Sequence, residues 1–364
     1  MKISVLGILV FVSFVPSWLS PLLDWLVITA DRAKAGRGVR GYTLAWFLRT
    51  YFGRRRVGIA APGELRKSPI AADTLFLGLP SSLTPEEITS FLGAGAYRRI
   101  VLFDYLDEQQ LAWTPEQEAA LRPLTRHYLK PWRESVWNYD LEMGMLPIRR
   151  SARLFSAILV DRARRRIGRT PKPQYDVAFL GQPNDTRVIA GGEVRIIDQR
   201  FEWLNDLKRE APDLSFWGGL IGGDPQIVAR LTAAHGDFSH LYYPGGRVGF
   251  PNYFSAIRRS RVLLAPGGNA PWTYRHYECL YAGGVVVTID FRQREMLIPL
   301  PGEGLVHVPD GASVVPYVRE AIELSRKRQA IGDENYAHLE RYLRFGNYSR
   351  SRKELINRFT AQLD

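Results

Sequence analysis

The chain has 364 residues, of which 46% are hydrophobic, and its formal net charge is +12. This length exceeds an ordinary single domain and suits two domains with sizeable cores. The single cysteine, Cys279, excludes an internal disulfide, and no clustered histidines accompany it as a structural zinc site requires. The positive charge favours an anionic partner, which is a nucleic acid, an anionic membrane surface or an anionic small substrate.

Basic residues are spread along the chain rather than arranged as one stripe. No RNA-binding motif, zinc finger or helix-turn-helix is evident, so we expect no nucleic-acid partner. The densest basic clusters lie at residues 32–40, 54–56 and 162–169. The first of them follows an apolar N-terminus, a placement that favours an anionic membrane surface.

Residues 1–28 form that apolar N-terminal segment, and their function is open. A signal peptide is disfavoured because no small-x-small cleavage site follows. A transmembrane anchor has the right length, but Pro16, Pro21 and Asp24 interrupt it. The third interpretation is a broken membrane segment, or in part the first strand of a sheet at 25–29. We expect the catalytic part on the cytoplasmic side of the membrane, peripheral or N-terminally anchored; a soluble cytoplasmic protein is the alternative.

Residues 29–168 are expected to form a first α/β domain. Strands are predicted at 74–79 and 100–103, and Thr84, Pro85 and Glu87 are typical of a capped helix start between them. The order strand, helix, strand predicts a right-handed parallel unit, in which ligands gather at the carboxyl ends of the strands. Asp104 follows the second of these strands.

Residues 169–345 are expected to form a second α/β domain after a proline-containing linker at 168–174. Its first strand, 175–181, ends in glycine, as Rossmann-type domains often begin. The pattern then predicts helices near 197–211, 253–259, 314–328 and 334–345, and strands at 214–217 and 305–308. A last helix, within residues 346–364, is expected to pack back on the first domain.

The most informative segment is 260–290, which predicts a strand, a loop, a helix and a strand. Val262 to Ala265 is a continuous apolar run, as in a parallel strand that is buried on both faces. Thr273 is a suitable N-cap for a helix over 274–282, and Gly283 is a suitable end. Residues 285–289 then form the next buried strand.

The loop of this segment is a candidate anion site. Pro266, Gly267, Gly268 and Asn269 precede the helix, whose free N–H groups and dipole attract negative charge. Arg275 and Glu278 lie three residues apart and therefore share one helix face. The first suits phosphate oxygens and the second suits sugar hydroxyls, which together describe a pocket for a diphosphate with a ribose. The alternative is an ordinary surface Arg–Glu pair.

This segment resembles the donor-binding segment of exostosin-like glycosyltransferases and related two-Rossmann (GT-B) enzymes. The resemblance implies two Rossmann-like domains facing across a cleft, with residues 29–168 on the acceptor side and 169–345 on the nucleotide-sugar side. It also implies that Arg275 contacts the diphosphate and that Glu278 contacts the ribose. The pattern departs at Gly284 and Val286, which leaves the subfamily open. The matching residues are Pro266, Gly267, Gly268, Arg275, Glu278, Leu280, Ala282, Gly283 and 285–287.

Several other chemistries lack their motifs. There is no Asp-x-Asp, no P-loop and no Gly-x-Ser-x-Gly, so we expect no metal, no NTPase of that form and no serine hydrolase. A metal-free transferase stabilises the leaving diphosphate with dipoles and cations. Gly267, Gly268 and Arg275 can supply these, and no further cofactor is expected.

The remaining site residues are weaker candidates. Direct displacement needs a general base near the acceptor hydroxyl, and Asp104 is the first choice, with His127 as one alternative. Asp107 and Glu108 are the others, and for each of the four the favoured alternative is an ordinary surface residue. Tyr274 and Trp272 can stack on a base or pack in the core. Arg247, on a glycine-rich turn, is a second cation for the donor or a solvated side chain.

We therefore predict a metal-independent glycosyltransferase that moves a sugar from a nucleotide-diphosphate donor to a glycan or lipid-linked acceptor, in envelope polysaccharide or glycoconjugate synthesis. A nucleotide-sugar epimerase or dehydrogenase is a rival that needs Gly-x-Gly-x-x-Gly directly after the first strand. The second half lacks this motif after its first strand, 175–181, and the one such spacing in the first half, Gly36, Gly38 and Gly41, does not directly follow the strands predicted at 74–79 and 100–103. The other rival is a membrane-associated scaffold or binding protein with a degenerate glycosyltransferase fold.

Overall fold

The computed structural model describes residues 171–343 except 185, 191–192, 269–272, 291 and 293–299. In the first half it describes the strands β1 (Ala72–Gly78), β2 (Tyr97–Phe103) and β3 (Tyr128–Leu129) with a few residues between them, and near the C-terminus Asn357. The chain divides into two compact units, and each is described here by itself. The predicted domain boundaries stay predictions.

The described part of the first unit is a parallel sheet in the order β1-β2-β3. The two longer strands confirm the predicted strands and their parallel pairing. The helix start between them is also confirmed, because the Thr84 amide donates to Glu87 Oε2 (2.8 Å) and the Glu87 amide donates to Thr84 Oγ1 (3.3 Å). This reciprocal pair is a capping box, which satisfies donors that a helix start otherwise leaves unpaired.

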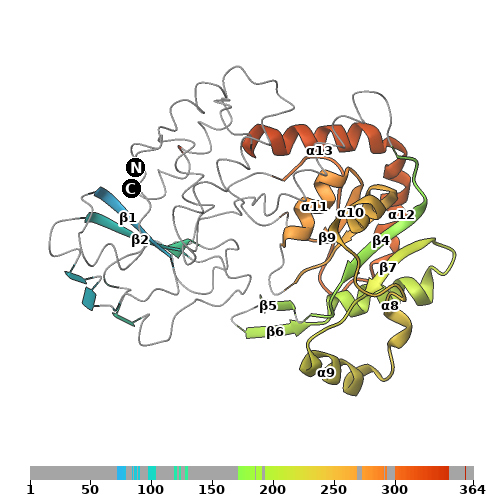
Figure 1. Ribbon diagram of the computed structural model, residues 1–364, viewed down its shortest axis with the longest axis horizontal. Coiled ribbons are helices and arrows are strands. Elements are labelled where there is room, and N and C mark those ends of the chain that lie inside the picture. The colour runs from blue at the N-terminus through green and yellow to red at the C-terminus, as the bar shows by residue number, and fades with distance from the viewer. Residues whose placement is uncertain are drawn as a thin grey trace. The chain divides into compact units, whose positions relative to one another are not determined.

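The second unit contains a five-stranded parallel sheet in the order β10-β9-β8-β4-β7 (Figure 1). Counted along the chain from β4, this is the doubly wound order 2-1-3-4-5. The strands β4, β9 and β10 have the predicted bounds, and β8 begins before Val262. The strands are β4 (Tyr175–Gly181), β7 (Phe216–Leu220), β8 (Ser260–Ala265), β9 (Val285–Ile289) and β10 (Leu305–Val308).

Helices cover both faces of this sheet. α8 and α12 pack on one face, and α10 and α11 pack on the other. This arrangement follows from right-handed crossovers that run in opposite directions from the centre of the sheet. The helices are α8 (Gln199–Glu210), α9 (Pro225–His235), α10 (Phe250–Arg258), α11 (Tyr274–Ala282), α12 (Val315–Leu324) and α13 (Arg328–Leu343).

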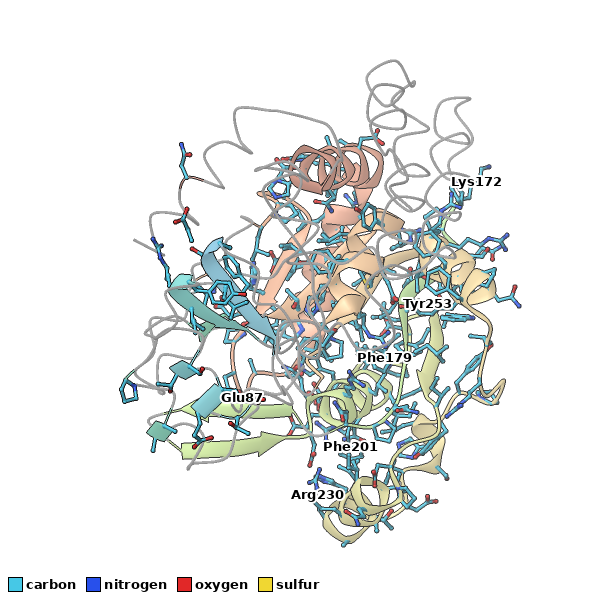
Figure 2. All side chains as sticks on the ribbon, turned by 60° about the vertical axis from the view of Figure 1, so that its left-hand side comes forward. Glu87, Lys172, Phe179, Phe201, Arg230 and Tyr253 are labelled. Atoms are coloured by element: carbon cyan, nitrogen blue, oxygen red, sulfur yellow. The ribbon has the colours of Figure 1, made fainter. Side chains whose placement is uncertain are left out.

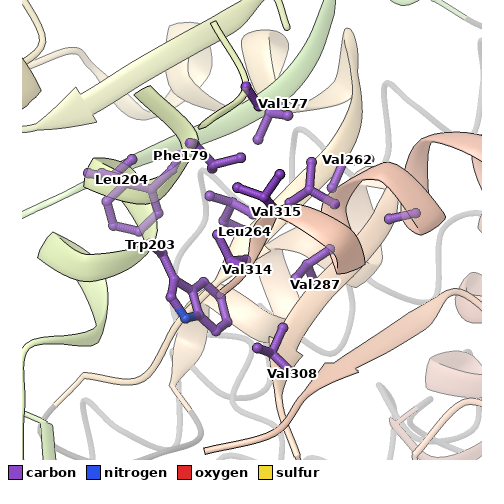
Figure 3. Packing of buried hydrophobic residues seen from close by; sticks show 14 of the residues in the cluster. Val177, Phe179, Trp203, Leu204, Val262, Leu264, Val287, Val308, Val314 and Val315 are labelled. Carbon is purple, nitrogen blue, oxygen red and sulfur yellow. The ribbon is translucent and has the colours of Figure 1, made fainter. Parts of the chain in front are cut away.

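The main hydrophobic core lies between the sheet and the α8–α12 layer. Figure 3 shows Val262, Leu264 and Val287 of neighbouring strands beside Val314 and Val315 at the start of α12. The intervening strand residues are buried against the other helix layer. The central strands are therefore apolar on both faces, as their continuous apolar sequences predict.

Two elements of the second unit were not predicted. An antiparallel hairpin joins β5 (Thr186–Ala190) to β6 (Glu193–Ile197). The Gly-Gly pair between them in the sequence is a hairpin signal. The other element is α9, whose start has a clear signal: Asp224 accepts a hydrogen bond from the Gln226 amide (2.8 Å), and Pro225 occupies the first turn.

The strand predicted at 214–217 is wrong in its bounds: β7 begins two residues later, because Leu214 belongs to the turn before it, and ends three residues later, after Gly218 and Gly219. Gly218 has φ of +103°, and a Cβ there would lie 1.8 Å from the Phe179 carbonyl oxygen. Only glycine lets β7 approach β4 in this way. Both glycines, which lie just after the predicted strand, are thus strand residues.

The amino ends of the central strands are joined by a polar network around Asp176. The carboxylate of Asp176 accepts hydrogen bonds from the Ser215 amide (3.0 Å) and hydroxyl (2.7 Å). It also pairs with Arg261 of β8, with 3.3 Å between Nε and Oδ1. This network ties β4, β8 and the segment before β7 together at the edge opposite to the carboxyl ends.

The apolar segment 1–28 lies outside the described residues, as do the predicted elements at 39–51 and 57–61 and most of the predicted last helix. Within the part of the chain that the structure describes, no helix combines the length and the hydropathy needed to cross a bilayer.

Candidate functional site

The strand order of the second unit reverses between β4 and β8. The chain leaves β4 toward α8 and β7 on one side, and it leaves β8 toward α11 and β9 on the other. In open α/β sheets such a point leaves a crevice at the carboxyl ends of the two strands, which is where ligands bind. Here that position is defined by residues 182–184, which follow β4, and residues 266–268, which follow β8, and we call it the crevice.

The helix α11 is positioned at this crevice by signals that the sequence predicted. It spans Tyr274–Ala282 with Thr273 as its N-cap, and it ends at Gly283, whose φ of +75° is left-handed. The next residue allows close packing on β8, because a Cβ on Gly284 would lie 2.8 Å from Leu263. The helix start is therefore fixed relative to the ends of β8 and β9.

A buried histidine completes this helix start. The Thr273 amide donates to Nδ1 of His276 (3.0 Å), so the ring proton is on Nε2, which lies 2.8 Å from Thr288 Oγ1 on β9. Burial, aided by the nearby Arg275 charge, lowers the pKa of His276 to about 3. This side chain is neutral and internally bonded, which places it in the structural framework.

Arg275, the adjacent residue, reaches into the crevice. Its guanidinium carbon lies 4.7 Å from the centre of the Phe179 ring on β4, and its Nη1 donates to the Tyr253 hydroxyl (3.4 Å). Figure 2 shows these two contacted residues near each other on β4 and α10. Its Nε is buried and has no hydrogen-bond partner among the residues that the structure describes. A Cβ on Gly181 would lie 2.8 Å from Nη2, so the glycine that ends β4 makes room for this arginine.

A second arginine, Arg200, bridges the two sides of the crevice. It lies in the first turn of α8, and its Nε donates to the Gly267 carbonyl (2.8 Å) while its Nη1 donates to the Gln182 carbonyl (2.7 Å). Its Nη2 lies 3.0 Å from the position that a Cβ on Gly268 would occupy. Burial, followed by the charge of Arg275, lowers the pKa of Arg200 to about 9, so the group is still protonated at neutral pH.

The two arginines make the crevice strongly positive. Within the described part of the chain, neither guanidinium forms an ion pair with a carboxylate; each bonds to neutral oxygens. Two cations that lie near each other and are partly removed from water repel each other. An anion that reaches both relieves this repulsion, and the planar donor array of arginine matches phosphate oxygens.

Glu278 lies one turn further along α11 and is half-buried. The buried hydroxyl of Tyr253 donates to its Oε2 (3.0 Å). The carboxylate is therefore oriented from α10 as well as from its own helix. Its predicted contact with a ribose stays a prediction.

Arg247 is exposed, yet it faces the same edge of the sheet. Two side-chain nitrogens, Nη2 of Arg247 and Nε2 of Gln182, each lie 3.8 Å from the position that a Cβ on Gly222 would take. The glycine that follows β7 thus brings this third cation near the end of β4.

The loop after β8 differs in one respect from the prediction. The Gly267 amide donates to the side chain of Gln199 (2.8 Å), and the Thr273 amide is engaged by His276. These two backbone donors are used within the protein, so they are not free for an anion. Pro266 and Gly268 are buried beside them, and the site's positive charge comes mainly from arginine side chains.

Some predicted site residues lie outside the described residues: Asp104, Asp107, Glu108, His127, Asn269, Trp272 and the side chain of Tyr274. Cys279 is buried, and burial raises the pKa of its thiol to about 12, which supports its interpretation as a small core residue. Two important residues were missed by sequence reasoning, Arg200 and Tyr253. Both come from other helices, and only the fold brings them to the crevice.

The sequence matches no protein-family model and no curated protein. Among solved structures, the chain is similar to HepE of Anabaena in complex with UDP, with 13% identity, a TM-score of 0.45, and coverage of 82% of this chain and 81% of that chain. It is similar to α,α-trehalose 6-phosphate synthase of Burkholderia multivorans, with 13% identity, a TM-score of 0.41, and coverage of 92% and 78%. It is also similar to TarM of S. aureus, with 8% identity, a TM-score of 0.41, and coverage of 79% and 55%. All three are distant structural similarities, with TM-scores below 0.5.

Proposed function

We propose that the second unit binds a nucleotide-diphosphate sugar, and that the chain is a glycosyltransferase of the two-domain GT-B kind. The observation that carries the proposal is the pair of guanidinium groups, Arg200 and Arg275, at the carboxyl ends of β4 and β8. They converge where the strand order reverses, and among the described residues each donates hydrogen bonds only to neutral oxygens.

The chemistry of sugar transfer fits this pair. The leaving nucleoside diphosphate gains negative charge as its bond to the sugar breaks, and donors that are already in place stabilise that charge best. Arg200 is held by two carbonyl groups, and Arg275 is held between Phe179 and Tyr253. Both cations are therefore positioned before a ligand arrives.

The finer parts of the proposal rest on the resemblance of residues 260–290 to exostosin-like enzymes. In that proposal Glu278 accepts hydrogen bonds from the ribose, and Asp104 of the first unit takes the proton of the acceptor hydroxyl. The acceptor is a glycan or a lipid-linked sugar, and the enzyme works at the cytoplasmic face of a membrane without a metal ion.

Calorimetric titration with UDP, GDP, CDP and ADP tests the donor site. We expect one of these nucleotides to bind the wild-type protein, and Arg275→Ala to weaken it about 100-fold, because a charge-assisted contact with the diphosphate is lost. Arg200→Ala should weaken binding about tenfold, since its carbonyl contacts compete with the ligand. Arg326→Ala is the matched control, as it removes an exposed arginine from the same unit.

Wild-type affinity in both crevice variants would contradict the site. A second measurement, of free nucleotide formed from a bound nucleotide sugar, distinguishes an enzyme from a binding protein. An enzyme releases the nucleotide, and a binding protein does not. Binding of a nucleotide sugar without hydrolysis or transfer, in the presence of membrane-derived acceptors, would favour the degenerate scaffold.

A further inference from the structure

Three polar groups from two helices meet beside the crevice. The hydroxyl of Tyr253, on α10, donates to Glu278 Oε2 (3.0 Å) and accepts from Nη1 of Arg275 (3.4 Å). A phenol hydroxyl has one proton to donate and lone pairs that accept, so both bonds are possible at once. Tyr253 is only 8% exposed, and its hydroxyl is held between the two charged groups of α11.

The spacing of the two charged residues makes this arrangement unusual. Arg275 and Glu278 are three residues apart on one helix, a spacing at which opposite charges ordinarily pair directly. The structure has no direct ion pair between these two described side chains, and each of them contacts the tyrosine hydroxyl instead. The tyrosine thus occupies the place of the expected salt bridge.

The spacer has an electrostatic consequence. An arginine paired with a carboxylate must give up that partner before it binds an anion, which subtracts from the affinity for the anion. An arginine that contacts a neutral hydroxyl gives up much less. Burial raises the pKa of Tyr253 well above its usual value, so the hydroxyl stays neutral and keeps its proton for the carboxylate.

We propose that Tyr253 is a positioning residue that holds Glu278 apart from Arg275, so that the cation stays available for a diphosphate. This inference rests on the proposed function and adds a determinant of its donor affinity. Loss of the hydroxyl lets the two charged side chains pair with each other.

The test uses inorganic pyrophosphate, which contains the diphosphate without the ribose, and measures its affinity by calorimetry at fixed ionic strength. Four full-length proteins are compared: the wild type, Tyr253→Phe, Glu278→Gln and the double variant. We expect Tyr253→Phe to weaken pyrophosphate binding about five- to tenfold. Glu278→Gln should bind at least as tightly as the wild type, and the double variant should bind as Glu278→Gln does.

The dependence on Glu278 separates this role from simple packing. If the tyrosine only packs, its replacement weakens binding equally with and without the carboxylate, and the proposal is overturned. Wild-type affinity of Tyr253→Phe overturns it as well. Tyr243→Phe is the control, because Tyr243 belongs to the same aromatic group, 5.6 Å from Trp217 between ring centres, and should leave affinity unchanged. Thermal unfolding of each variant confirms that it is folded.

The outcome also distinguishes this inference from the proposed function. A wild-type protein that binds neither pyrophosphate nor any nucleoside diphosphate overturns both. A wild type that binds, loses affinity in Arg275→Ala and shows no coupling between Tyr253 and Glu278 overturns the inference alone.

Discussion

Two sets of polar side chains lie at the carboxyl ends of the second unit's strands, and they are neighbours in the sequence. The closed set is satisfied within the protein: Asp198 pairs with Arg230 of α9, with 2.9 Å between Oδ2 and Nη1, and His276 bonds to Thr273 and Thr288. The open set is Arg200 and Arg275, which donate only to neutral groups within the described ranges of the chain. Figure 2 shows Arg230 on α9 close to Phe201 of α8.

The two sets therefore differ in role. The closed set belongs to the structural framework, and the open set belongs to the candidate ligand site. Each open arginine lies one or two residues from a closed residue at the start of its helix, and within the described part of the chain it has no carboxylate partner. A paired arginine stabilises the fold, whereas an unpaired one in a partly buried crevice costs stability until an anion binds. We therefore expect variants of the closed set to change stability and variants of the open set to change affinity.

The largest effect on stability should come from Arg230→Met. The side chain of Asp198 is 12% exposed and that of Arg230 is 37% exposed, so the change leaves a largely buried carboxylate without its bidentate partner. We expect a loss of about 2 kcal/mol in the free energy of unfolding, measured by urea titration.

The matched control is Arg319→Met, which breaks a bidentate pair with Asp213 whose side chains are 49% and 59% exposed. Its cost should be below about 1 kcal/mol. Nucleotide affinity should stay within about twofold in both variants, since neither residue belongs to the open set. A strong loss of affinity in Arg230→Met would remove the distinction between the two sets.

An effect of intermediate size concerns His276 and pH. The folded protein leaves this imidazole neutral down to about pH 3, whereas the unfolded chain takes up a proton below about pH 6.5. Unfolding therefore binds a proton in this window, and stability is lost as the pH falls from 6.5, by about 1 kcal/mol per pH unit from this group.

His276→Gln has no such proton to take up, so its stability should fall less steeply with decreasing pH in the same urea titrations. The exposed His240→Gln should keep the slope of the wild type. If the free energy of unfolding changes equally with pH in all three proteins, His276 takes up its proton in the folded state as well. His276 would then not belong to the closed set.

The smallest effect should come from Gly181→Ala. The added methyl group would lie 2.8 Å from Nη2 of Arg275 and 2.9 Å from Cζ of Phe179, so the guanidinium must shift. We expect nucleotide affinity to fall about threefold while stability changes by less than 1 kcal/mol. Gly302→Ala, whose methyl group meets nothing within 4 Å, should change neither. A loss of stability without a loss of affinity would mean that Arg275 does not bind the ligand.

Local signals in the sequence predicted much of the second unit. Continuous apolar runs marked the central strands, and Thr273 and Gly283 marked both ends of α11, because buried strands and helix caps depend on a few adjacent residues. The hairpin β5–β6 and the helix α9 carried signals of the same kind that were not used. Local sequence was therefore sufficient for most elements.

The site was only half predictable. Arg275 and Glu278 share one helix, so their spacing alone indicated a common face. Arg200 comes from α8 and Tyr253 from α10, and no spacing relates them to α11. Sheet order brings them together, and sheet order is a long-range property that a single sequence does not display. The same limit hid the engagement of the Gly267 amide by Gln199, which is 68 residues away.

The network around Asp176 lies at the opposite edge of the sheet from the crevice, and it has a consequence for how such a protein can change. Strand alignment is secured at the amino ends by Asp176, Ser215 and Arg261. Insertions and substitutions in the loops at the carboxyl ends therefore do not disturb the bonds that hold the strands in register. Evolution or protein design can therefore change those loops to suit another sugar donor while the five-stranded sheet keeps its structure.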